Sequence, residues 1–140
     1  MSGMQETLAI IKPDATARGL TGEIIARFER AGFEVVQMRC EPASEELFRR
    51  LYAEHAHKPH FDMMIAAVTA GEVCFLRLRR EDAVAQARRL VGPTDPADAA
   101  PGTLRGDYGI DFRHNSVHTA DSEEAAEREL RLVFGDAAAG

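Results

Sequence analysis

The apolar residues of this chain follow two strand–helix–strand series separated by further helices, and this order restricts the folds available to it. Short apolar or alternating runs are typical of strands, and apolar residues spaced three and four apart are typical of helices. The pattern predicts strands at 7–11, 33–40, 73–78 and up to 118, and helices at 24–31, 44–55, 61–68, 81–91 and 122–134. We therefore predict an α/β (α+β) fold with a ferredoxin-like β-α-β-β-α-β core, a four-stranded antiparallel sheet with helices on one face, plus extra helices and a long loop.

This topology brings together two residues that are far apart in the sequence. The first and last strands of a ferredoxin-like sheet are neighbours. Lys12 directly follows the first predicted strand, and His118 ends the last one. We therefore expect the Lys12 ammonium to lie close to the His118 imidazole.

His118 is the centre of the predicted site because it ends a strand and almost directly precedes a helix. Asp121 and Ser122 are good N-cap residues, and Asp121 with Glu124 fits a capping box. The donor-rich start of a helix suits phosphate. Glu129 lies on a helix face from which its carboxylate can reach the imidazole. A carboxylate on one ring nitrogen leaves the other with a free lone pair, as a nucleophilic histidine requires.

Arginine dominates the basic residues, so the two lysines stand out. Of the 17 basic residues only Lys12 and Lys58 are lysine. An ammonium is a compact point charge on a flexible stem, whereas a guanidinium is a planar fork. We interpret Lys12, at the rim of the sheet, as a position that requires an ammonium.

Composition limits the function classes. A formal net charge of −6 argues against general nucleic-acid binding, although it permits a local basic pocket. Cys40 and Cys74 form neither a disulfide framework nor a metal-ligand spacing, so we expect buried thiols in a reducing compartment. The strand at 33–40 places Val36, Met38 and Cys40 on one face, which we expect to be its buried face.

We predict one domain over residues 1–140, with a frayed tail at about 135–140. Residues 1–6 lack the pattern of a secretion signal, and no apolar run approaches a membrane span, so we expect a soluble, cytoplasmic protein without membrane contact. The stretch 92–109 lacks periodicity, and its mixed polar residues favour an ordered binding loop.

Several stretches spread over the chain match the motifs of one known family in the same order. They are 10–14, 18–20, 22–25, 27–29, 31–33, 52–55, 94–98 and 101–107, together with Asn115, His118, Asp121 and Ser122. Several dispersed motifs in the right order are more specific than any one of them. On these stretches the chain strongly resembles the nucleoside diphosphate kinase family.

The resemblance implies ping-pong transfer of the γ-phosphoryl group of a nucleoside triphosphate, usually ATP, to a nucleoside diphosphate through a phosphohistidine. It implies His118 as nucleophile and Glu129 as the residue that orients it. The implied shell around phosphates and ribose is Lys12, Tyr52, Arg88, Thr94, Arg105 and Asn115. The reaction itself requires the same residue types. Phosphoryl transfer depends on correct positioning of the reacting groups and on cations around the oxygens of the transferred phosphoryl group.

The family also implies Mg²⁺ carried on the nucleotide phosphates, without direct protein ligands. It implies tolerance of all common bases and both sugars, which supports synthesis of GTP, UTP, CTP and the deoxynucleotides. A homo-oligomer built from dimers is implied as well, either tetrameric or hexameric.

Four positions depart from the family pattern. His60 replaces the usual stacking Phe, and Phe112 replaces an aliphatic residue on the other side of the base. We interpret this as an aromatic base clamp that has partly changed sides. Thr119 and Ala120 replace the Gly and Ser that usually follow the histidine, which predicts slower turnover but not loss of activity.

Three alternatives remain open from the sequence. A metal cluster at His55, His57 and His60 lacks a companion Cys or carboxylate pattern. A ferredoxin-like regulatory module that binds a small ligand would explain the fold but not the gathered catalytic residue types. A phosphohistidine carrier that serves other proteins is the third. Incubation with labelled ATP and a nucleoside diphosphate separates the last two alternatives from a kinase, and zinc bound to the purified protein would support the first.

Overall fold

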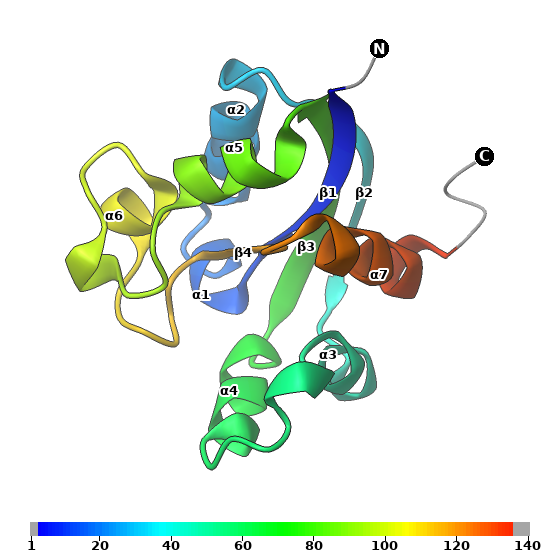
Figure 1. Cartoon of the computed structure of the whole chain (residues 1–140). Helices are drawn as coiled ribbons and strands as arrows, with labels where there is room; N and C mark the ends of the chain where they lie inside the picture. Colours follow the sequence, from blue (N-terminus) through cyan, green and yellow to red (C-terminus); the bar gives the residue numbers. More distant parts are fainter. Residues whose placement is uncertain (1–2, 136–140) are drawn as a thin grey trace.

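The computed structural model describes residues 3–135, which form a four-stranded sheet flanked by helices (Figure 1). The predicted tail at about 135–140 lies, except for Gly135, outside the described residues. The strands are β1 (Met4–Ile11), β2 (Glu34–Pro42), β3 (Glu72–Glu81) and β4 (Val117–Thr119). Their order in the sheet is β2-β3-β1-β4 and every neighbouring pair is antiparallel, which confirms the predicted topology.

Helices cover both faces of this sheet. The helices are α1 (Pro13–Thr16), α2 (Thr21–Arg30), α3 (Glu45–Leu51), α4 (Phe61–Val68), α5 (Ala83–Val91), α6 (Leu104–Tyr108) and α7 (Glu123–Phe134), with single 3₁₀ turns at Ala53–His55 and Pro96–Asp98. The two crossover helices, α2 and α5, share one core with one face of the sheet, as the ferredoxin-like core predicts. The extra helices α3 and α4, together with α7, share a second core with the opposite face.

The central strand β1 shows why both faces are covered. Ala9 and Ile11 belong to the core beneath α2 and α5, whereas Leu8 and Ile10 belong to the core beneath α3, α4 and α7. All four side chains are fully buried. A strand buried on both faces reads as a continuous apolar run, which is what the sequence shows at this position.

The expected burial of β2 is wrong. Val36 and Met38 are exposed, with relative exposures of 38% and 56%, while Gln37 and Arg39 on the other face are half-buried. β2 is an edge strand and carries a register shift between Val35 and Gln37. At an edge, alternation of apolar residues does not guarantee a covering layer, because neighbouring elements extend over one side of the strand only.

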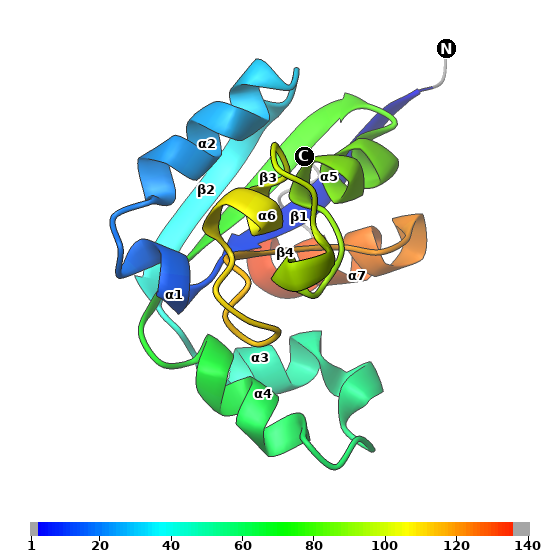
Figure 2. The same cartoon turned by 90° about the vertical axis from the view of Figure 1, so that its left-hand side faces the viewer.

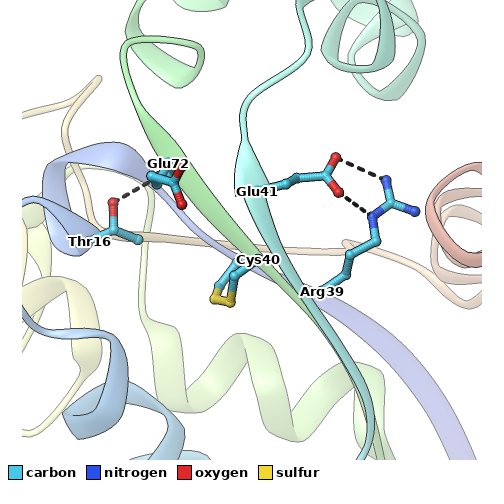
Figure 3. Close-up of a disulfide and its surroundings, with 6 residues drawn as sticks. Thr16, Arg39, Cys40, Glu41 and Glu72 are labelled. Carbon is cyan, nitrogen blue, oxygen red and sulfur yellow. Dashed lines mark hydrogen bonds and ion pairs between the residues drawn. A yellow bond between two sulfur atoms is a disulfide. The ribbon is translucent and has the colours of Figure 1, made fainter.

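The expectation of two buried free thiols is also wrong. Cys40 and Cys74 form a disulfide between β2 and β3 (Figure 3), and the Cys40 residue is exposed. The two residues face each other directly in the strand register. Linear spacing cannot reveal this pairing because it depends on which residues of two separate strands become opposite.

The stretch 92–109 is ordered, as predicted, but it contains two short helical elements that lack an apolar period. The Asp95 side chain accepts a hydrogen bond from the Ala97 amide (2.9 Å), and the Thr103 hydroxyl accepts one from the Gly106 amide (3.0 Å). These are N-cap contacts, so local polar groups rather than apolar periodicity begin these turns. Within residues 3–135 no helix is long and apolar enough to cross a bilayer.

Candidate active site

A pocket of about 340 Å³ lies where β1 and β4 end. Its lining comes from α3 and α4 on one side and from the stretch 92–115, which contains α6, on the other, and Figure 2 shows these two parts of the chain facing each other. The volume of the pocket is in the range of small-molecule sites. Every residue that the sequence assigned to the site lines this pocket: Lys12, Tyr52, His60, Arg88, Thr94, Arg105, Phe112, Asn115, His118 and Glu129.

His118 is held by Glu129 in the way that the sequence predicted. His118 lies opposite Ile10 in the β1–β4 pairing, and its Nε2 is 3.1 Å from Glu129 Oε1. Only 4% of the Glu129 side chain is exposed, against 21% for His118. A carboxylate accepts hydrogen bonds, so Nε2 carries the proton and Nδ1 keeps its lone pair. The arrangement leaves a pocket-lining nitrogen free for nucleophilic attack.

The N-cap of α7 aims Glu129 at the imidazole. The Ser122 hydroxyl accepts a hydrogen bond from the Ala125 amide (3.0 Å), so Ser122 is the cap and Asp121 is not. Glu129 is two turns beyond this cap, on the buried face of the helix. Asp121, which the sequence had offered as a cap, instead lines the pocket.

Tyr52 forms the wall beside the imidazole. Its ring centroid is 5.5 Å from that of His118, and the residue is almost completely buried. Burial raises the pKa of the Tyr52 hydroxyl, and the Glu129 charge raises it further. The phenol therefore remains protonated and can donate a hydrogen bond into the pocket.

Lys12 lies at the end of β1, with its ammonium already engaged. Its Nζ donates to Asn115 Oδ1 (2.8 Å) and to the Arg113 carbonyl (3.0 Å). Burial lowers the pKa of Lys12 to about 8, although the charge of nearby Asp14 opposes this effect. The ammonium is thus charged at neutral pH, desolvated, and oriented before any ligand binds.

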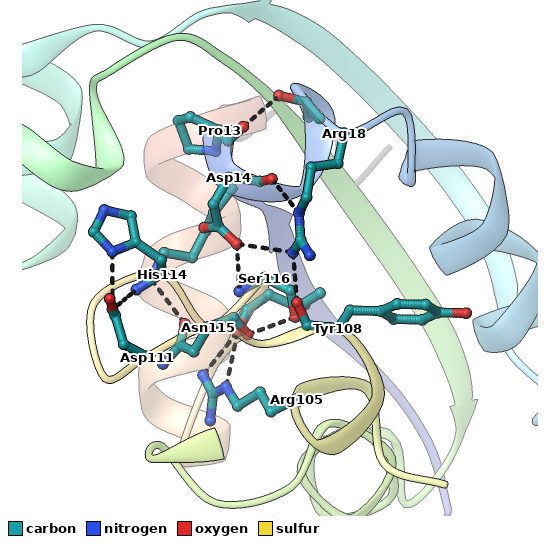
Figure 4. A network of polar contacts seen from close by, with 12 residues as sticks. Pro13, Asp14, Arg18, Arg105, Tyr108, Asp111, His114, Asn115 and Ser116 are labelled. Carbon is teal, nitrogen blue, oxygen red and sulfur yellow. Dashed lines mark hydrogen bonds and ion pairs between the residues drawn. The ribbon is translucent and has the colours of Figure 1, made fainter. Parts of the chain in front are cut away.

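A strained residue sets the course of the chain into β4. Ser116 has a positive φ of 77°, a conformation that costs a non-glycine residue free energy. Its amide donates to Asp14 Oδ2 (3.0 Å), and its carbonyl accepts from the Lys12 amide (2.9 Å), as Figure 4 shows for the Asp14 contact. Sequence reasoning missed Asp14 and Ser116 because the contact joins the starts of two different elements.

Arg105 approaches the site from α6. Its Nη2 and Nε donate to the Val117 carbonyl (2.7 and 3.2 Å), and its Nη1 donates to the Gly92 carbonyl (3.0 Å). Burial lowers the pKa of Arg105 to about 10, so the guanidinium remains charged at neutral pH. The side chain therefore places a fixed positive charge one residue away from His118 along β4.

The remaining predicted residues form the open side of the pocket. Arg88 and Thr94 are exposed, His60 is half-buried, and Phe112 is 50% exposed. Asn115 links this side to the ammonium, because its Nδ2 donates to the carbonyls of Thr94 (2.9 Å) and Phe112 (3.3 Å).

Further charged residues that the sequence had not assigned also line the pocket. They are Glu54, His55, Lys58, Arg113 and Asp121. The lining thus has five basic side chains against three acidic ones, in a chain whose formal charge is −6. The sequence did contain a signal for Lys58, because it is one of only two lysines in the chain. Both of these lysines line the pocket. Burial and the Lys58 charge lower the pKa of His55, which favours its neutral form beside the site.

The predicted alternative of a histidine metal cluster finds no supporting geometry. Within residues 3–135 no group of three or more His, Cys, Asp or Glu side chains is placed to hold a metal ion. His55 and His60 line the pocket but His57 does not. A lining rich in cations suits an anionic ligand better than a bare metal ion.

Comparison with known proteins agrees with the geometry. A family model described as nucleoside diphosphate kinase matches residues 5–139. The nucleoside diphosphate kinases of Archaeoglobus fulgidus and Pyrococcus furiosus are 44% and 46% identical to the chain, covering 95% and 96% of it and 88% and 85% of their own lengths.

Solved structures give the same result. The Aquifex aeolicus nucleoside diphosphate kinase superposes with a TM-score of 0.92 at 32% identity, covering 96% of this chain and 97% of its own. A halophilic nucleoside diphosphate kinase from Halobacterium salinarum in complex with CDP superposes with a TM-score of 0.91 at 44% identity. The match covers 95% of this chain and 89% of the Halobacterium salinarum chain. The chain therefore belongs to the nucleoside diphosphate kinase family.

Proposed function

We propose that His118 Nδ1 is the phosphoryl acceptor in the nucleoside diphosphate kinase reaction of this chain, which transfers the γ-phosphoryl group of a nucleoside triphosphate to a nucleoside diphosphate. The observation that carries the proposal is the 3.1 Å contact of His118 Nε2 with Glu129. It leaves Nδ1 with its lone pair on a ring that lines a pocket with five basic side chains.

The reaction has two balanced half-steps. In the first, the Nδ1 lone pair forms a bond to the γ-phosphorus while the bond to the β,γ-bridging oxygen breaks, so the nucleoside diphosphate leaves with that electron pair. Nε2 keeps its proton, which is hydrogen-bonded to Glu129, and the Glu129 charge balances the positive charge that develops on the ring. In the second, an oxygen of another diphosphate attacks the same phosphorus, and Nδ1 regains its lone pair.

The cations of the pocket stabilise charge on the transferred oxygens. Lys12 is buried and Arg105 is fixed by three hydrogen bonds to carbonyl groups, so neither needs to reorganise during the step. Mg²⁺ would neutralise further charge while bound to the nucleotide phosphates. Acidic side chains in the lining are few, and Glu129 is occupied by His118, which fits an ion that enters with the nucleotide.

We propose broad base and sugar tolerance with ATP as the usual donor. Phe112 and His60 both line the pocket, and an aromatic ring that stacks on a base does not read the hydrogen-bonding edges of that base. Their presence in the same lining supports the proposed exchange of the stacking aromatic between the two sides of the base.

We also propose a homo-oligomer built from dimers, with one catalytic domain over residues 1–140. Val36 and Met38 are exposed on the edge strand β2, and exposed apolar side chains on a sheet edge favour association. Light scattering of the purified protein measures the subunit number and separates a tetramer from a hexamer.

The test is a coupled assay of ATP with a nucleoside diphosphate, on the wild type and on His118→Ala. His57→Ala is the matched control, because His57 is exposed and outside the pocket lining. With γ-labelled ATP, the wild type and His57→Ala should take up acid-labile label that GDP discharges, and His118→Ala should take up none. Label that GDP fails to discharge would favour a phosphohistidine carrier, and no label on the wild type would favour a ligand-binding module.

A further inference from the structure

The short helix α6 has one side chain that lines the pocket and two that contact α2, a helix far from it in the sequence. Arg105 lines the pocket, whereas Asp107 and Tyr108 contact α2. Figure 4 shows the Arg105 guanidinium and the Tyr108 ring pointing in different directions from α6. Any shift of α6 relative to α2 would therefore move Arg105 within the site.

One residue of α2 makes most of these contacts. Arg27 Nη1 is 3.1 Å from Asp107 Oδ2, and its Nη2 donates to the Gly102 carbonyl (2.6 Å). The Arg27 guanidinium carbon lies 5.7 Å from the centroid of the Tyr108 ring. Arg27 thus contacts residues at both ends of the segment 102–108.

Apart from Arg105 itself, whose guanidinium donates to the Gly92 and Val117 carbonyls, the segment is held by a small number of contacts. An isolated helix of five residues does not form in water, so α6 depends on tertiary contacts. Leu104 is fully buried and anchors one side. On the α2 side the Tyr108 hydroxyl donates to Glu23 (3.0 Å) and Arg18 Nη2 donates to the Tyr108 carbonyl (2.5 Å). Arg27 adds a charge-assisted fork to these contacts.

The Asp107 carboxylate, which contacts Arg27, also links the two ends of the segment 102–108. Asp107 Oδ1 accepts a hydrogen bond from the Gly102 amide (3.0 Å). This hydrogen bond, together with the Arg27 contact, lowers the pKa of Asp107. Gly102 is therefore held from two directions, through its amide by Asp107 and through its carbonyl by Arg27.

We propose that Arg27 is a positioning residue for phosphoryl transfer, which acts through α6 on the placement of Arg105. The inference rests on the proposed function, because it assumes that Arg105 contacts the nucleotide phosphates. Arg27 does not line the pocket, so its effect on nucleotides must pass through the segment 102–108.

The experiment compares Arg27→Gln with Arg30→Gln in the full-length enzyme. Arg30 is on the same helix, is exposed, and has no side-chain hydrogen bond or ion pair among the described residues 3–135. We expect Arg27→Gln to lower kcat/KM for the nucleoside diphosphate about five- to tenfold, and Arg30→Gln to stay near the wild type. Arg27→Lys keeps the positive charge but not the planar guanidinium, so we expect it to lower kcat/KM less than Arg27→Gln does.

A double-mutant cycle separates positioning from general weakening of the fold. In an Arg105→Gln background the Arg27→Gln substitution should cost less than about twofold, because its effect acts through the removed guanidinium. Amide hydrogen exchange of the peptides that cover 102–108 should be faster in Arg27→Gln than in Arg30→Gln.

Two results would overturn the proposal: a kcat/KM for Arg27→Gln equal to that of Arg30→Gln, or an Arg27→Gln loss of the same size with and without Arg105. Failure of the proposed function is a different observation, since the wild type itself would then show no transfer and no labelled histidine.

Discussion

The inner part of the pocket and its rim differ in how firmly their side chains are held. The inner part, which we call the phosphate end because we propose that the nucleotide phosphates bind there, consists of Lys12, Arg105, Asn115, His118 and Glu129, all buried or half-buried and each with at least one side-chain hydrogen bond. The rim consists of His60, Arg88, Thr94 and Phe112. Within residues 3–135 no side-chain hydrogen bond or ion pair fixes His60, Arg88 or Thr94.

The difference teaches where preorganisation is needed. Groups that stabilise developing charge work best when they are already desolvated and oriented. Groups that admit and release many nucleotides gain from exposure and from freedom to adjust to different bases. Substitutions at the phosphate end should therefore reduce turnover, and those at the rim should alter affinity.

The largest expected effect is at Lys12. Lys12→Met should lower kcat by about 100- to 1,000-fold, because a fixed charge on the transferred oxygens is lost. Lys12→Arg keeps a charge with a different shape and should retain more activity. Steady-state kinetics on the three proteins measure this, and a kcat within threefold of the wild type for Lys12→Met would break the contrast between the two regions.

The same ammonium predicts a pH dependence. Its pKa of about 8 in the free enzyme means that kcat/KM should fall as pH rises through about 8, since the charged form is the active one. Lys12→Arg should lack this fall, because a guanidinium remains charged.

Protein stability should change in the opposite direction to activity. The folded pKa of Lys12, about 8, lies below the value of about 10.4 for an unfolded chain. Between these values the unfolded chain binds more protons, so this lysine makes the free energy of unfolding rise with pH, by at most about 3 kcal/mol. Urea unfolding at pH 7.5 and 9.5 should show a rise in the wild type that Lys12→Met lacks.

A smaller loss is expected at Glu129. Glu129→Gln keeps the shape but removes the charge that holds the Nε2 proton of His118. Partners that orient a functional histidine are typically worth about 10- to 100-fold. We expect a loss of this size in kcat, with KM little changed, and slower uptake of label from γ-labelled ATP. A loss confined to KM would show that Glu129 acts in binding and not in orientation.

The smallest effect is expected at the rim. Phe112→Ala should raise nucleotide KM about fivefold and leave kcat unchanged, because stacking contributes equally to ground state and transition state. Ile110→Ala is the control, since Ile110 is an exposed apolar residue of the same loop that does not line the pocket. An unchanged KM for Phe112→Ala would reject the exchanged base clamp.

The sequence predicted most of this fold because its elements have strong local periods. The apolar run of β1, the helical spacing of α2 and α5, and the capped start of α7 each report on residues that are close together in the chain. Helix α1, a single turn that Pro13 begins, was missed because four residues are too few to show a period.

The features that the sequence could not predict depend on how elements far apart in the chain are arranged. Whether the Val36 side of β2 is buried depends on which helix reaches the edge of the sheet. The Cys40–Cys74 disulfide depends on which residues of β2 and β3 lie opposite each other. The contact between Asp14 and Ser116 joins residues at the starts of two elements 102 positions apart.

The amino-acid sequence by itself determined which chemical groups the chain possesses, the family to which it is similar, and the order of its strands and helices, because all of these follow from residue identity and local spacing. Tertiary structure decided the orientation of the imidazole, the desolvation of the Lys12 ammonium and the contact of Arg27 on α2 with Asp107 of α6. These are long-range properties. They arise only when strand pairing and burial place distant side chains within hydrogen-bonding distance and remove the water between them.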